Sequence, residues 1–193
     1  MTISATRAAI AAGLALVLAS CGGASQPGGD GAPDATTAPA SNAMPAKWNA
    51  TDACSILDKA VVAEALKIEI TETQLDSVKE PDAITAGTSE CSYLDATGTP
   101  AATLMTRWSP MNDNSPGTIG IAREAAASAL KAMSDEPLED IHGLGKAAFF
   151  VPTINQLQVF IDDARMIVVT SSRVPSGTSA KDIAVALAHK AGA

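Results

Sequence analysis

Residues 156–161, Gln-Leu-Gln-Val-Phe-Ile, and residues 165–171, Arg-Met-Ile-Val-Val-Thr-Ser, are separated by only three residues, Asp162-Asp163-Ala164. Leu157 and Val159 lie two positions apart, as do Ile167 and Val169, and two is the side-chain period of a β-strand. A connection this short joins antiparallel neighbours. The stretch therefore predicts a β-hairpin.

Five further strands are expected outside this hairpin. Residues 88–94 and 101–108 flank a turn marked by Gly98 and Pro100, and they predict a second hairpin. Three shorter strands are predicted at residues 67–71, 138–141 and 147–151. Residues 76–87 contain a proline, a glycine and several charges without period, so they predict a loop.

Three helices are expected from capping residues and apolar periodicity. Asp58 caps the first, whose apolar side is formed by Val61, Val62, Ala65 and Leu66. Ser115 and Pro116 open the second, whose apolar residues are Ile119, Ala122, Ala126, Leu130 and Met133. Ser179 opens the third, which carries Ile183, Leu187 and Ala191 on one face.

Together these elements predict an α+β fold. Hairpins dominate the strand connections, so we expect an antiparallel sheet with three packed helices rather than a doubly wound parallel sheet. Residues 48–193 are long enough to form one domain with its own core.

The N-terminal segment predicts export. Residues 1–20 carry a single charge, Arg7, followed by an uncharged run that is too short to span a membrane. Leu18-Ala19-Ser20-Cys21 resembles the lipobox of bacterial lipoproteins. The alternative is an ordinary signal peptide cut at an Ala-x-Ala-like site.

The lipobox resemblance implies that residues 1–20 are removed and that Cys21 carries diacylglycerol and a further acyl chain such as palmitate. Two or more chains hold a protein stably on a bilayer. Residues 22–47 are rich in Gly, Pro, Ala, Ser and Thr and predict a flexible tether. Since Gly22 follows the cysteine, the resemblance points to the outer membrane, facing the periplasm, in a cell with two membranes. In other cells the protein would lie on the outer face of the plasma membrane.

Charge and composition exclude some partners. Removal of residues 1–20 takes away Arg7 and no acid, so the formal charge changes from -8 to -9. A negative domain repels nucleic acid and anionic lipid surfaces. Aromatic residues make up 3% of the chain, which disfavours aromatic platforms for sugars or single strands. The membrane contact expected is therefore the lipid on Cys21 alone.

The chain has three cysteines. With Cys21 lipidated, Cys54 and Cys91 remain as a pair in an oxidising compartment, where disulfides persist. We expect these two residues to form a disulfide. A redox-active pair is the less favoured alternative, because a Cys-x-x-Cys spacing is missing.

Three short motifs carry a family resemblance. They are residues 52–58, Asp-Ala-Cys-Ser-Ile-Leu-Asp; residues 91–93, Cys-Ser-Tyr; and residues 141–150, Ile-His-Gly-Leu-Gly-Lys-Ala-Ala-Phe-Phe. They resemble small bacterial envelope lipoproteins of unknown function that open with a Cys-Ser-Leu-Leu type motif. Some of these relatives are assigned a PsbP-like α/β sandwich, so the resemblance implies that fold. It implies no catalytic residues.

No motif with a known catalytic mechanism is recognised. Only His142 and His189 are present, so a histidine-rich metal site is not expected. Residues 143–146, Gly-Leu-Gly-Lys, lack the spacing of a nucleotide-binding loop. Residues 112–117 resemble half of a calcium loop, but Pro116 occupies a ligand position. Acidic pairs such as Asp162-Asp163 are interpreted as turn or surface residues. We therefore expect no catalytic residue, metal or cofactor.

The favoured hypothesis is a non-enzymatic, lipid-anchored envelope protein whose domain binds an unidentified envelope protein or small ligand. One alternative is a structural or assembly factor of an envelope complex, which would expose a large apolar patch. The other is an envelope hydrolase whose site is assembled from dispersed residues, which would need a pocket with convergent polar groups.

Overall fold

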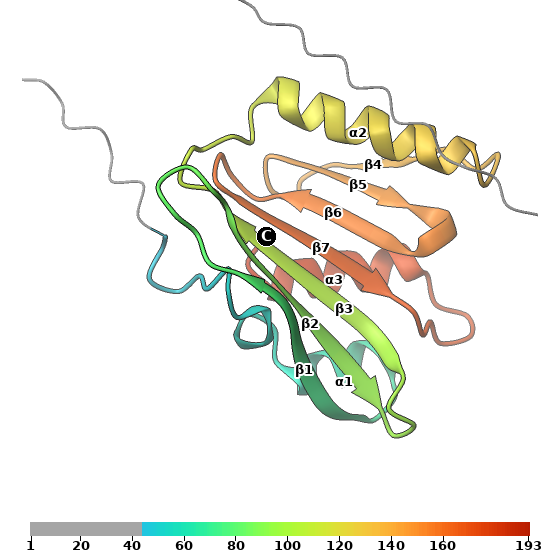
Figure 1. The fold of residues 1–193 in the computed structure, drawn as a ribbon. Coiled ribbons are helices and arrows are strands. Elements are labelled where there is room, and N and C mark those ends of the chain that lie inside the picture. Colours follow the sequence, from blue (N-terminus) through green and yellow to red (C-terminus); the bar gives the residue numbers. More distant parts are fainter. Residues whose placement is uncertain (1–43) are drawn as a thin grey trace, which may run out of the picture. The chain divides into compact units, whose positions relative to one another are not determined.

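The computed structural model describes residues 44–193. The predicted signal peptide, Cys21 and residues 22–43 of the predicted tether lie outside the described residues. Within 44–193, seven strands form one antiparallel sheet in the order β1-β2-β3-β7-β6-β5-β4 (Figure 1). The strands are β1 (Ile70–Lys79), β2 (Gly87–Asp95), β3 (Pro100–Trp108), β4 (Glu139–Ile141), β5 (Ala147–Val151), β6 (Gln156–Phe160) and β7 (Arg165–Ser171).

The α+β prediction of an antiparallel sheet with three helices is confirmed. The helices are α1 (Lys59–Leu66), α2 (Pro116–Lys131) and α3 (Ala180–Lys190), and two short 3₁₀ segments are η1 (Ala53–Ser55) and η2 (Pro152–Ile154). Each α-helix begins at a predicted cap, because the side chains of Asp58, Ser115 and Ser179 accept hydrogen bonds from backbone N–H groups of the first turn. Among the described residues, no helix is long and apolar enough to cross a membrane.

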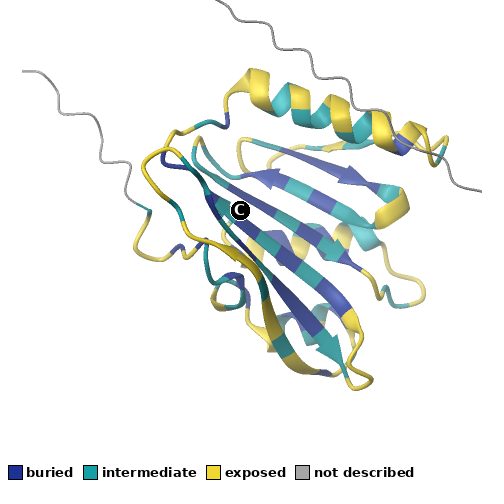
Figure 2. Cartoon of the chain, in the orientation of Figure 1, coloured by how far each residue is buried: buried dark blue, intermediate teal, exposed yellow. Residues whose placement is uncertain are grey.

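The helices lie on both faces of the sheet (Figure 1). α1 and α3 pack on one face over a core that includes Tyr93, Leu104 and Ile167. α2 packs on the other face over a smaller core that includes Phe149 and Phe160. Alternate residues of the central strands are buried, as Figure 2 shows. The core on the α1 and α3 side is therefore the larger of the two, and α2 covers only part of the other face.

Two sequence predictions are wrong in extent. The strand predicted at residues 67–71 begins at Ile70 and continues to Lys79, into the region predicted as a loop. Of its ten residues only Ile70 is buried, so β1 lacks the apolar alternation that reveals a strand; its pairing with β2 holds it in the sheet. Met133 lies beyond the end of α2 and is 58% exposed, because the helix ends at Lys131.

Candidate functional site

A disulfide joins Cys54 in η1 to Cys91 in the middle of β2, as the cysteine count predicted. Polar bonds reinforce the same junction. The buried hydroxyl of Ser89 accepts from the Ala53 backbone N–H at 2.8 Å and donates to the Ala50 carbonyl oxygen at 2.9 Å. These groups fix η1 and the residues just before it on the sheet, so the cysteines have a structural role.

Tyr93, two residues after Cys91, serves the same junction. Its side chain is fully buried, and its hydroxyl donates to the Leu57 carbonyl oxygen at 2.7 Å. Burial raises the pKa of the Tyr93 phenol above its ordinary value, with the nearby Asp58 carboxylate adding to the shift. The phenol is therefore a neutral hydrogen-bond donor that connects η1 and α1 to β2.

A second polar cluster lies at one end of the sheet and centres on Asn114. This residue is 1% exposed, and its Nδ2 donates to the carbonyl oxygens of Asp162 at 2.8 Å and Arg165 at 3.0 Å. Lys146 Nζ donates to the Asn114 carbonyl oxygen at 2.8 Å and also pairs with Asp163. The cluster joins the loop before α2 to the β6–β7 turn. It therefore includes residues of the calcium-loop-like segment 112–117 and of the acidic pair Asp162-Asp163.

Two carboxyl groups of this cluster have lowered pKa values. The hydrogen bond from Arg107 holds the pKa of Asp113 below its ordinary value, against the opposing effect of desolvation. Desolvation would raise the pKa of Asp162, but hydrogen bonds from Arg165 and from the backbone N–H of Ala164 outweigh it and lower the pKa. Both groups are therefore ionised partners of arginines.

The other residues singled out in the sequence do not come together. His142 is exposed in the turn after β4, and His189 is exposed in the last turn of α3. Asp140 pairs with Arg123 of α2, and Glu139 pairs with Lys181 of α3. No group of three His, Cys, Asp or Glu residues that could hold a metal ion is found within residues 44–193.

The Gly-Leu-Gly-Lys segment is a turn between β4 and β5. Gly143 and Gly145 have left-handed backbone angles, φ +78° and +58°. A Cβ on Gly145 would lie 2.6 Å from the Phe160 carbonyl oxygen, whereas one on Gly143 would meet nothing within 4 Å. Gly145 thus permits a close approach to β6 that any side chain would block.

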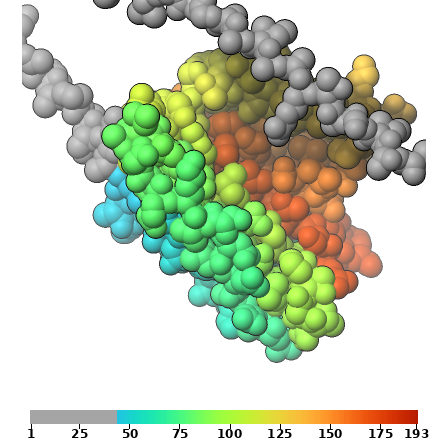
Figure 3. Space-filling view, viewed as in Figure 1, coloured from blue at the N-terminus to red at the C-terminus, as the bar shows by residue number. Residues whose placement is uncertain are grey.

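The uncovered part of the sheet carries a row of polar side chains on the α2 side. Directly paired residues point to the same face of a sheet. The pairs Gln74–Ser92, Ser92–Thr103, Thr103–Thr170 and Thr170–Gln156 extend this row across β1, β2, β3, β7 and β6. We call these five residues the polar row. Figure 3 looks onto this face, with β1 and β2 in green and β7 in red.

Hydrogen bonds hold four of the five side chains of the polar row in place. Gln156 Nε2 donates to Thr170 Oγ1 at 3.2 Å. The carboxylate of Asp76 accepts from Ser92 Oγ at 3.1 Å and from Gln74 Nε2 at 2.9 Å. Ser92 is itself buried, so the other four residues of the row present donors and acceptors on this face. Sequence analysis missed this surface because β1 was not recognised beyond its first residues.

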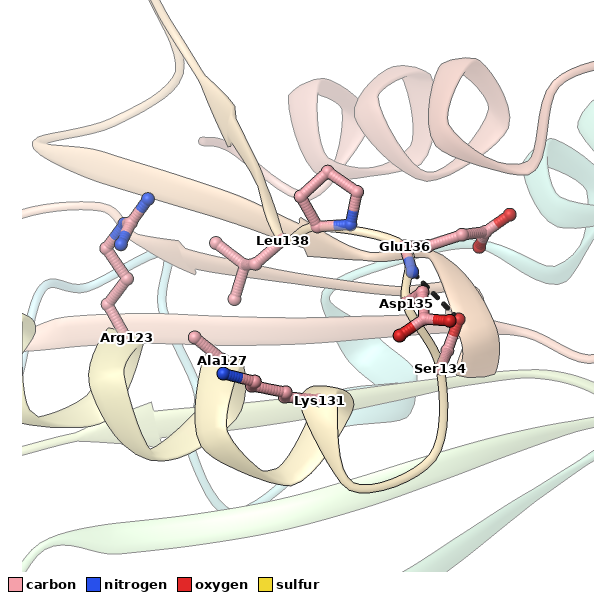
Figure 4. A pocket seen from close by; sticks show the side chains of 8 residues that line it. Arg123, Ala127, Lys131, Ser134, Asp135, Glu136 and Leu138 are labelled. Atoms are coloured by element: carbon pink, nitrogen blue, oxygen red, sulfur yellow. Dashed lines mark hydrogen bonds between the residues drawn. The ribbon is translucent and has the colours of Figure 1, made fainter.

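The hollows characterised on residues 44–193 are open to solvent. One of about 370 Å³ lies beside α2, where Arg123, Ala127 and Lys131 face Leu138 and the segment that carries Asp135 (Figure 4). Positive side chains, Arg123 and Lys131, and negative ones, Asp135 and Glu136, line this open depression, so it does not select a ligand of one charge. A larger one, of about 400 Å³, lies beside the start of α3 and has Asp182 as its only charged lining residue.

No protein-family model, curated protein or solved structure matches this chain. The resemblance to envelope lipoproteins and to a PsbP-like fold therefore stays a prediction.

Proposed function

We propose that this chain is a lipid-anchored protein of the bacterial cell envelope whose α+β domain binds an envelope protein or a small ligand and catalyses no reaction. The anchor would be Cys21, and the domain would lie outside the cytoplasm, on the outer membrane facing the periplasm or on the outer face of the plasma membrane. The Cys54–Cys91 disulfide supports an oxidising compartment. The sheet with helices on both faces is consistent with a PsbP-like sandwich, which is part of the proposal.

The observation that carries the binding function is the polar row. Five adjacent strands align polar side chains on a face that no described helix covers. The side chains of the row are uncharged, and hydrogen bonds hold four of them: Gln156 to Thr170, and Gln74 and Ser92 to the carboxylate of Asp76. Such a surface gives directional hydrogen bonds at small entropic cost, as specific binding requires.

The assembly-factor alternative needs one extended apolar patch. The large exposed apolar side chains are instead spread over β1, α2, η2 and three connections: Leu75, Val78, Ile84, Met111, Ile121, Met133 and Ile154. Isolated apolar side chains of this kind are ordinary on a protein surface. The distribution therefore favours a polar binding face over an apolar assembly surface.

Site-specific photocrosslinking in intact cells of the source organism tests the binding face. A photoreactive residue at Thr103, in the centre of the polar row, should give discrete products with a partner. The matched control is the same residue at Ser128, which is exposed on α2 away from the sheet. Substitution of Thr170 by Arg should remove the Thr103 products without unfolding the domain. Equal products from Thr103 and Ser128, or no product from Thr103, would contradict the proposed face.

A further inference from the structure

A hollow of about 290 Å³ lies where the described chain enters the domain. Its walls come from the segment before Trp48, from η1, from Arg165 at the start of β7 and from Lys190 at the end of α3. Trp48 belongs to the core on the α1 and α3 side of the sheet. The hollow is therefore distinct from the polar row, and nothing argued for it depends on that face.

Three cationic side chains, Lys47, Arg165 and Lys190, line this hollow, and no carboxylate does. The chain as a whole has 13 Lys and Arg against 21 Asp and Glu, so this concentration of positive charge runs against the overall composition. The other four hollows characterised on residues 44–193 each have at least one carboxylate in their lining. The hollow beside Trp48 is thus a local site of positive potential.

Most of this charge is not neutralised within the domain. Lys47 and Lys190 form no ion pair with any residue of the described range. Arg165 pairs with Asp162 through Nε at 2.7 Å, which leaves both terminal guanidinium nitrogens without a partner in that range. The guanidinium carbon lies 5.3 Å from the centre of the Trp48 ring, so the ring and Asp162 together orient the arginine.

Trp48 also lines the hollow. The side chain is 5% exposed, and its indole Nε1 is a buried donor that meets no acceptor among the described residues. Buried indole N–H groups ordinarily have a partner, since an unsatisfied donor costs about 1 to 3 kcal/mol.

We propose that the hollow beside Trp48 binds the phosphate group of a small phosphate ester. A phosphomonoester carries a double negative charge, whereas a carboxylate carries one. The three cations therefore match a phosphomonoester ligand better than a carboxylate ligand. The free fork of Arg165 suits two phosphate oxygens, and the two lysines supply point charges. The hollow leaves space for a small organic substituent beside the phosphate. The negative charge of the whole chain favours a soluble ester over the phosphates of an anionic bilayer.

The test uses the full exported chain with Cys21→Ser, so that the lipid anchor contributes nothing. The chain has two tryptophans, so its amide NMR spectrum contains two indole N–H signals, which a Trp48→Phe variant assigns. Titration with inorganic phosphate and with glycerol 3-phosphate should shift the Trp48 indole signal saturably, and sodium chloride at equal ionic strength should not. Lys47→Gln and Lys190→Gln should each weaken binding about tenfold, and the double variant about a hundredfold.

The matched control is Lys131→Gln, which removes the same charge from α2 and should bind phosphate as the parent does. The amide spectrum of each variant reports whether the domain is folded. Vesicles of phosphatidic acid distinguish the source: binding of the soluble ester without vesicle binding supports the proposal as stated. Vesicle binding that requires Lys47 and Lys190 overturns the soluble source and keeps the phosphate chemistry. The absence of a saturable Trp48 shift with both inorganic phosphate and glycerol 3-phosphate, or equal weakening by Lys131→Gln, overturns the site.

Discussion

The disulfide gives the most quantitative prediction, because its contribution to the free energy of unfolding can be calculated from the length of the loop it closes. Cys54 and Cys91 are 37 residues apart. In the chain-entropy description, closing a loop of this length removes about 4 kcal/mol of conformational entropy from the unfolded state. A domain of this size is ordinarily stable by about 5 to 15 kcal/mol, so the bond supplies a large part of the total.

The perturbation is the double variant Cys54→Ala/Cys91→Ala, measured by urea denaturation of the exported chain. We expect the free energy of unfolding to fall by about 3 to 4 kcal/mol and the denaturant slope to rise, because the unfolded chain becomes more expanded. Reduction of the parent protein should have a similar effect. The alanine at residue 91 removes a buried sulfur, so reduction separates the loss of the crosslink from the loss of packing.

A loss below about 1 kcal/mol on reduction, with an unchanged denaturant slope, would refute the chain-entropy reasoning. It would show that η1 stays on the sheet through its polar bonds alone, principally those of Ser89.

Three further results are expected. Tyr93→Phe should lower the free energy of unfolding by about 1 to 2 kcal/mol in denaturant titrations, because the Leu57 carbonyl oxygen loses its buried donor; an unchanged midpoint would contradict this. Gly145→Ala should destabilise the domain more than the matched Gly143→Ala, since only residue 145 meets the neighbouring strand; equal melting temperatures would count against it. The lowered pKa of Asp113 stabilises the folded state above the ordinary carboxyl pKa of about 4, and that contribution is lost as pH falls through the folded-state pKa; the acid-induced loss should be smaller in Asp113→Asn, and identical pH profiles of unfolding would oppose this.

Much of the fold could be predicted because local signals agree with tertiary packing. The β5 and β7 boundaries were predicted correctly, because β5 is a short apolar run that is buried almost throughout and β7 buries residues at a spacing of two. The capping serines and aspartate mark the helix starts for a purely local reason. Most of β1, beyond Thr71, escaped prediction because an exposed edge strand is defined by its pairing with β2 rather than by its own composition.

The candidate surfaces could not be predicted for a similar reason. The polar row depends on the register of five strands, and Gln74 and Gln156 are 82 positions apart in the chain (156 minus 74). The hollow beside Trp48 combines Lys47 with Arg165 and Lys190, which only the folded chain brings together. In contrast, the cysteine pairing follows from counting, once Cys21 is assigned to a lipid.

The central claim is that Cys21 anchors this domain in the cell envelope. Mass spectrometry of the N-terminal peptide from membrane fractions, with a Cys21→Ser variant analysed in parallel, tests it most directly. The account predicts a mature chain that begins at an acylated Cys21, and release of the variant from membranes. A mature chain that begins elsewhere with Cys21 unmodified, or unchanged membrane association of the variant, would contradict the account.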